Sequence, residues 1–127
     1  MSDDETELVL DKTHFRRIVE ESQSDDTAKR LADAFSTQAT QLADDISDLL
    51  NGGETSGPAV RGLLHRLRGS AEVIGACRLS AMTRRLLEND PENFCAKLRT
   101  ALPLLIETIG DTLAEILTLA GQRKPQP

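Results

Sequence analysis

The chain has 127 residues, enough for one domain with a real core, and it is 39% hydrophobic and 28% charged, as in ordinary globular proteins. Its net charge is −6 and its only aromatic residues are three phenylalanines, which argues against nucleic-acid binding. No apolar run has the length of a membrane span, and the acidic start MSDDETELVL lacks the layout of a signal peptide. We therefore expect a cytoplasmic protein without a membrane span.

The first helix is predicted near the N-terminus. Residues 1–7 are polar and acidic, so we expect them to be disordered, followed by one helical domain over residues 8–121. Asp11 has the position of an N-cap, and Leu10 and Phe15 are spaced as a hydrophobic staple. These signals predict a short helix over about 12–22, with His14 as an exposed or capping residue in its first turn.

A second, longer helix is predicted to start in the cluster Ser24-Asp25-Asp26 and to run to about Asn51, because apolar residues recur there at intervals of four and seven. Its acidic residues are interpreted as a solvated face, since the Glu-x-x-His pairs of a di-iron bundle are missing. Cys77 and Cys95 have no metal-binding or redox spacing and are expected to be free thiols. We therefore expect no metal site.

The remaining elements are also helical. A loop over residues 51–58 precedes a central helix that starts at Ser56 or Gly57 with Pro58 and ends at Gly75. A fourth helix over about 77–89 follows. A fifth starts at Asp90-Pro91 and ends at Gly121, with Pro103 predicted to kink or split it. Residues 122–127 are expected to form a flexible tail.

The pattern therefore predicts an all-α fold. No segment alternates like a β-strand, and four amphipathic helices with short connections favour an antiparallel up-down-up-down four-helix bundle. The additional short N-terminal helix is expected to pack across one end of this bundle.

The central stretch, VRGLLHRLRGSAEVI at residues 60–74, carries the candidate site. On a helix its apolar residues fall within an arc of roughly 100°, and His65 projects roughly 150° from the middle of that arc, into solvent. Its neighbours one turn away are Arg61, Gly62, Arg68 and Gly69. Each glycine costs about 0.8–1 kcal/mol in a helix, and both lie opposite the apolar face, so cleared space around His65 explains them better than close helix packing. An accessible imidazole nucleophile beside cations suits a transferred phosphoryl group.

The same residues resemble the signature of the histidine-containing phosphotransfer (HPt) domain family. The matching positions are HRLRGSA at 65–71, then IGA at 74–76, and Leu79. The resemblance implies that His65 is the phosphoacceptor, that Arg68 occupies the basic position that is commonly lysine, and that Gly69 is the small residue one turn on. Two features depart from the pattern: arginine instead of lysine at 68, and the negative charge of Glu72 on the phosphoacceptor face.

Charge is distributed unevenly along the chain. Residues 59–87 contain six arginines and one acidic residue, although the whole chain is acidic. This asymmetry indicates a localised binding face for an acidic partner. We expect partner docking through Arg66, Arg78, Arg84 and Arg85.

Together these features predict a phosphorelay carrier that accepts a phosphoryl group on His65 from the aspartyl phosphate of a receiver domain and passes it to a response regulator. Arg68 and Arg61 would stabilise the phosphoryl oxygens, and Gly69 and Gly62 would leave clearance. The resemblance implies that the receiver supplies the magnesium and its acidic ligands, so the chain needs no cofactor and is not an enzyme by itself.

The sequence leaves the setting of this carrier open. A hybrid sensor histidine kinase is one possible source of the donor receiver, and the chain can be a separate protein or a module of such a kinase. Two other functions remain as alternatives. One is a helical adaptor that docks on receiver-like domains without taking phosphate. The other is a dimerisation bundle, which would need an apolar outer stripe that the pattern does not predict, so a monomer is expected.

Overall fold

The computed structural model describes residues 8–22, 26–52 and 57–122. The expected disordered start at 1–7 lies outside these ranges, as do Ser24, Asp25, Ser56 and all but the first residue of the expected tail at 122–127. Within the described ranges every regular element is a helix. These helices are α2 (Lys12–Ser22), α3 (Thr27–Asn51), α4 (Gly57–Ile74), α5 (Cys77–Leu87) and α6 (Pro91–Gln122).

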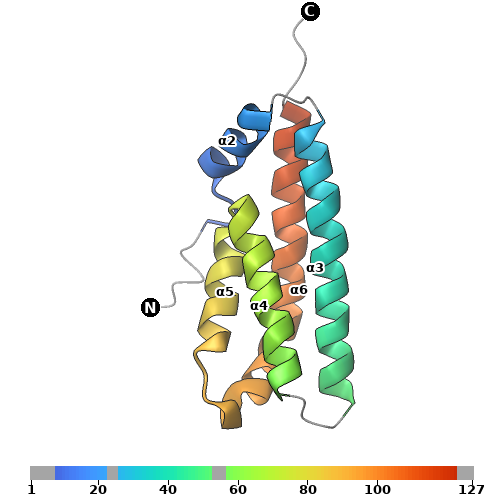
Figure 1. Cartoon of the computed structure of the whole chain (residues 1–127), viewed down its shortest axis with the longest axis vertical. Helices are drawn as coiled ribbons and strands as arrows, with labels where there is room; N and C mark the ends of the chain where they lie inside the picture. Colours follow the sequence, from blue (N-terminus) through green and yellow to red (C-terminus); the bar gives the residue numbers. More distant parts are fainter. Residues whose placement is uncertain (1–7, 23–25, 53–56, 123–127) are drawn as a thin grey trace, which may run out of the picture.

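Four of the helices form an antiparallel bundle, and the short α2 lies at one end of it (Figure 1). Helix α3 packs against α4 and α6, and α5 packs against the same two helices from the other side. Successive helices of the bundle run in opposite directions, so each helix ends near the start of the next one. The prediction of an all-α up-down-up-down bundle with an additional N-terminal helix is confirmed.

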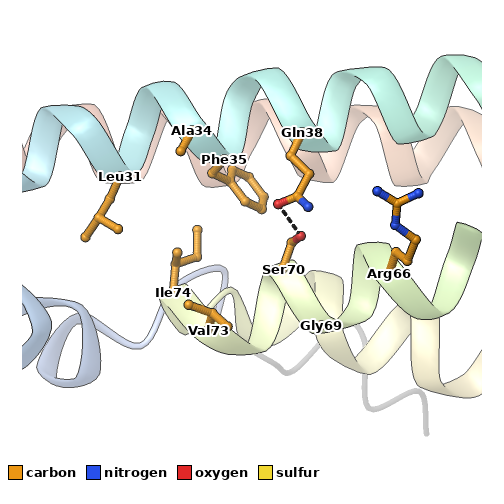
Figure 2. A pocket seen from close by; sticks show the side chains of 9 residues that line it. All are labelled: Leu31, Ala34, Phe35, Gln38, Arg66, Gly69, Ser70, Val73 and Ile74. Carbon is orange, nitrogen blue, oxygen red and sulfur yellow. Dashed lines mark hydrogen bonds between the residues drawn. The ribbon is translucent and has the colours of Figure 1, made fainter.

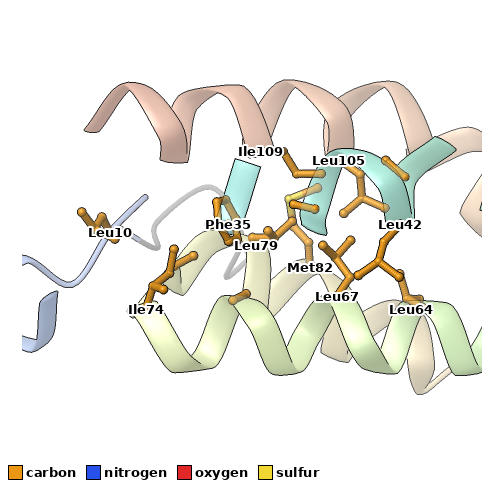
Figure 3. Packing of buried hydrophobic residues seen from close by; sticks show 14 of the residues in the cluster. Leu10, Phe35, Leu42, Leu64, Leu67, Ile74, Leu79, Met82, Leu105 and Ile109 are labelled. Atoms are coloured by element: carbon orange, nitrogen blue, oxygen red, sulfur yellow. The ribbon is translucent and has the colours of Figure 1, made fainter. Parts of the chain in front are cut away.

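The buried faces of these helices form one continuous core (Figure 3). On α4 the buried residues are spaced three and four apart, which is the spacing of one helix face. They are Val60, Leu64, Leu67, Ala71 and Ile74. Leu63, predicted to belong to the same face, is partly buried at its edge. Because this face is fixed in the core, the opposite face of α4 is held towards solvent.

Helix α2 is attached to the end of α4. The Asp11 carboxylate accepts a hydrogen bond of 3.0 Å from the backbone N–H of His14, so the predicted cap is confirmed. Leu10 and Phe15, the predicted staple residues, are both buried. The Asp11 N–H donates to the carbonyl of Gly75 at 2.7 Å. Gly75 has a φ of +82°, and a Cβ there would lie 3.0 Å from the His14 ring. This turn therefore requires glycine both for its backbone conformation and for the close approach of α2.

Helix α6 begins at Pro91 as predicted, but Pro103 does not split it. Pro103 is exposed, so water can reach the carbonyl that loses its backbone partner, while Leu98 and Leu105 anchor the helix in the core on either side. The same helix exposes apolar side chains that the pattern did not predict. Leu104, Ile106 and Leu117 are 52%, 50% and 53% exposed.

Candidate functional site

His65 lies in the middle of α4 and is exposed, as predicted. Gly62 and Gly69 are exposed one turn before and after it. A Cβ added at either glycine would meet no side chain or neighbouring helix within 4 Å. Neither glycine therefore serves helix packing, and the space that both leave is open to a molecule approaching the imidazole.

Arg68 lies one turn beyond His65 and is paired with Glu72. Its Nε donates a hydrogen bond of 3.0 Å to the Glu72 carboxylate, and the two side chains are 33% and 52% exposed. The negative charge of Glu72 on this face, which the family pattern does not explain, thus has a local partner. Arg68 still lies within one turn of His65, since residues three apart are neighbours on a helix.

Arg61 is directed towards the end of α5 and the start of α6 and is held there. Its guanidinium donates to the backbone carbonyls of Leu87 at 2.7 Å and Asn89 at 3.1 Å, and it lies 4.4 Å from the centre of the Phe94 ring. These contacts join α4 to the end of α5 and the start of α6. They argue against the predicted role of Arg61 at the phosphoryl group, because its donors already bind these carbonyls.

A groove of about 460 Å³ lies between α3 and α4 and includes Gly69, one turn from His65, in its lining (Figure 2). Gly69 and Arg66 form part of its lining, and Ser70 donates a hydrogen bond of 2.7 Å to the Gln38 side chain across it. The rest of the lining is apolar: Leu31, Ala34, Phe35, Val73 and Ile74. The surface next to His65 is therefore a shallow apolar trough with a cation at one end.

The predicted docking arginines do not share one surface. Arg66 lines the groove beside Gly69, and Arg84 is exposed on α5. Arg85 and Arg78 are half-buried, and Arg85 lines a different groove, between α5 and α6, together with Lys97. Because neighbouring residues on a helix project about 100° apart, Arg84 points away from that second groove and into solvent.

Other candidates are tied to structural roles. His14, the second histidine, is half-buried, and its Nε2 lies 2.9 Å from the Val73 carbonyl at the end of α4. Cys77 and Cys95 are not joined in a disulfide, and the Cys77 thiol donates a hydrogen bond of 3.4 Å to the Gly75 carbonyl. Among the described residues no group of three His, Cys, Asp or Glu side chains is placed to hold a metal ion. None of the helices over these residues is long and apolar enough to cross a membrane.

Sequence reasoning missed the α3 side of the site. Ala34, Phe35 and Gln38 reach the groove only because α3 packs beside α4, and no local pattern shows that. One signal was present: Val73 falls outside the apolar arc of α4 and is 64% exposed, so an apolar side chain stands on the polar face. Single exposed apolar residues are common, which is why this signal is weak without the neighbouring helix.

Comparison with known proteins agrees with this geometry. The family model for the Hpt domain matches residues 30–118. The chain therefore belongs to the Hpt family, whose members carry phosphoryl groups on a histidine and relay them to and from receiver domains. These domains are phosphocarriers and not catalytic enzymes by themselves.

One solved structure shows the same fold. It is the X-ray structure of a rice protein described as a histidine-containing phosphotransfer protein, with 17% sequence identity and a TM-score of 0.77. The match covers 91% of this chain and 86% of the rice chain. No curated protein matches the sequence.

Proposed function

We propose that His65 accepts a phosphoryl group from the aspartyl phosphate of a receiver domain and passes it to the aspartate of a response regulator. The observation that carries this proposal is the setting of His65: an exposed imidazole in the middle of α4, between two glycines beside which a Cβ would meet open space. His14 lacks such a setting, since its ring lies against the turn that joins α4 to α5.

The transfer step follows from the imidazole. A ring nitrogen with a free lone pair attacks the phosphorus, an N–P bond forms, and the bond between phosphorus and the aspartyl oxygen breaks. The electron pair of the broken bond stays on the aspartate as a carboxylate, and the other ring nitrogen keeps its proton. Transfer to the next receiver is the reverse, so the same nitrogen is first nucleophile and then leaving group.

Arg68 is the side chain of this chain that we place at the phosphoryl oxygens. Phosphoryl transfer depends mainly on positioning and on neutralising the charge of the oxygens. Arg68 is the cation one turn from His65 that remains half-exposed, whereas Arg61 is bound to backbone carbonyls. The magnesium ion and its acidic ligands belong to the receiver, so this chain supplies half of the transfer site.

Docking of the receiver is proposed to use the groove between α3 and α4 together with one exposed arginine on α4 and one on α5. The apolar lining offers surface to bury, and Arg66 at the groove and Arg84 on α5 offer charge to an acidic partner. Arg85 is left out of this surface, because it lines the groove on the α6 side of α5.

The test is incubation with a purified receiver domain that has been phosphorylated with labelled phosphate, followed by mapping of acid-labile phosphate on this chain. We expect all label on His65, none on the His65→Gln variant, and wild-type labelling of the matched His14→Gln variant. Helicity and melting temperature of His65→Gln should stay close to wild type, because an exposed polar substitution costs little. Full labelling of His65→Gln would refute the assignment.

An adaptor function remains the second candidate, because the groove could bind a receiver without any chemistry at His65. The two functions differ in one measurement. A carrier takes up label and binds the receiver, and its His65→Gln variant still binds. An adaptor binds with the same affinity in both forms and takes up no label in either.

A further inference from the structure

Glu72 is the feature of the acceptor face that transfer chemistry alone does not explain. Arg68 lies three residues after His65 and four residues before Glu72, so it is a helical neighbour of both. In the structure its Nε is bound to Glu72 at 3.0 Å. The cation next to the acceptor is therefore already paired before any phosphoryl group arrives.

A purely structural reason for Glu72 is weak. Helix α4 ends at Ile74, so Glu72 lies in the last turn, where the helix dipole disfavours a negative charge. The order of the pair, with the cation N-terminal to the acid, is also the less favourable one for residues four apart. A glutamate at this position is thus a poor way to stabilise the helix, and its contact with Arg68 calls for another reason.

We propose that Glu72 is a positioning residue that holds Arg68 while His65 is unmodified and releases it to the phosphoryl group when His65 is phosphorylated. This inference rests on the proposed function of His65. A phosphoryl group carries a charge of about −1.5 to −2 near pH 7, more than the single charge of a carboxylate. Both partners lie within one turn of Arg68, and the contact with Glu72 is one hydrogen bond between side chains that water reaches, so exchange requires only a change of rotamer.

The exchange has a consequence for a carrier. An arginine that bound only the phosphoryl group would stabilise phosphorylated His65 fully and would oppose onward transfer. Because Arg68 must first leave Glu72, part of that stabilisation is offset. Glu72 thereby keeps the equilibrium between the receiver phosphate and the histidine phosphate closer to even, which suits transfer in both directions.

The first experiment measures that equilibrium with one purified receiver at fixed protein concentrations. An equilibrium constant is chosen because it does not depend on docking rates. Pairs of residues four apart on a helix contribute about 0.3–0.5 kcal/mol, so Glu72→Gln should raise the ratio of His65 phosphate to receiver phosphate about twofold. The glutamine keeps a hydrogen-bond acceptor but loses the charge that strengthens the contact.

Two controls isolate the contact. In an Arg68→Ala background the Glu72→Gln change should have no effect, because the partner for which Glu72 competes is gone. Glu107→Gln removes one negative charge from an exposed position on α6 and should leave the ratio unchanged. An effect of Glu72→Gln that persists without Arg68 would show simple repulsion between Glu72 and the phosphoryl group, and would overturn the proposal.

The second experiment is spectroscopic and needs no receiver. The protein is phosphorylated with phosphoramidate, which gives up its phosphoryl group with release of ammonia, and the Arg68 Nε–H resonance is followed by NMR. In the unmodified protein this resonance should shift on Glu72→Gln, and after phosphorylation it should be the same in both proteins. A resonance that still responds to Glu72 after phosphorylation would mean that Glu72 braces Arg68 permanently, which contradicts release.

Failure of this inference can be told from failure of the proposed function. If His65 takes phosphate from neither the receiver nor phosphoramidate, the assignment of the acceptor is wrong. If His65 is phosphorylated normally but Glu72→Gln changes neither the equilibrium nor the resonance, the acceptor stands and the exchange of Arg68 is wrong.

Discussion

Replacing Gly69 by leucine should change the stability of the fold and the rate of phosphoryl transfer in opposite directions. Gly69 is in the interior of α4, it is exposed, and a side chain there meets nothing within 4 Å. Leucine is a good helix former, whereas glycine costs about 0.8–1 kcal/mol relative to alanine. Gly69→Leu should therefore stabilise the fold by about 0.5–1 kcal/mol, which raises the melting temperature by about 2–5 °C for a domain of this size.

The same substitution should slow phosphoryl transfer. The new side chain stands one turn from His65 and at the edge of the groove between α3 and α4, so it occupies space that a receiver must enter. A misplacement of about 1 Å in the reacting atoms can cost about 100-fold in rate. We expect Gly69→Leu to transfer at least about tenfold more slowly, with Gly69→Ala between it and the wild type.

The assay is single-turnover transfer from a phosphorylated receiver, quenched rapidly and repeated at rising receiver concentration. Gly110→Leu is the matched control, because Gly110 is also an exposed glycine inside a helix with open space beside it, but on α6. It should gain the same stability and transfer at the wild-type rate. A wild-type rate for Gly69→Leu at saturating receiver, or an equal loss in Gly110→Leu, would refute the clearance argument.

Other substitutions test the remaining assignments. Arg61→Ala should lower the free energy of unfolding by about 2 kcal/mol, because hydrogen bonds to two backbone carbonyls and a ring contact are lost. Urea denaturation measures this free energy, and an unchanged unfolding midpoint would contradict the structural role of Arg61. Gly75→Ala should destabilise by about 1–3 kcal/mol, the opposite sign to Gly69→Leu, because its φ is +82°; thermal unfolding decides the sign. Arg84→Ala should slow association with the receiver at low salt, and the association rate should return to the wild-type value at about 1 M salt, where charges are screened within about 3 Å. Arg85→Ala should change the association rate little. Equal defects of the two variants in stopped-flow binding would show that both arginines face the partner.

The features that local chemistry determines were predictable from the sequence. Asp11 caps a helix because its carboxylate reaches a backbone N–H in the next turn, Gly75 ends one because it accepts a positive φ, and Pro91 starts one where no N–H is needed. The exposure of His65 follows equally from helix periodicity. These predictions depend on residues within a turn or two of each other, and the structure confirms them.

The features that depend on neighbouring helices were not predictable. Arg61 resembles Arg68 in sequence, being also one turn from His65. Its guanidinium binds carbonyls at residues 87 and 89, and only the packing of α4 on α5 makes these reachable. The charge pattern of the sequence placed Arg84 and Arg85 in one docking surface, although they face different sides of α5. The partners of Arg61 and the groove beside Gly69 both needed the arrangement of the bundle.

The position of His65 has a thermodynamic consequence. It stands in the middle of an 18-residue helix whose other face is fixed in the core, not on a loop that could close over a ligand. Docking of a receiver should therefore order no backbone in this chain, and the heat-capacity change of binding should match the burial of the apolar groove alone. Calorimetry at several temperatures would show a small negative value, and different receivers would have to fit one rigid surface by rearranging side chains.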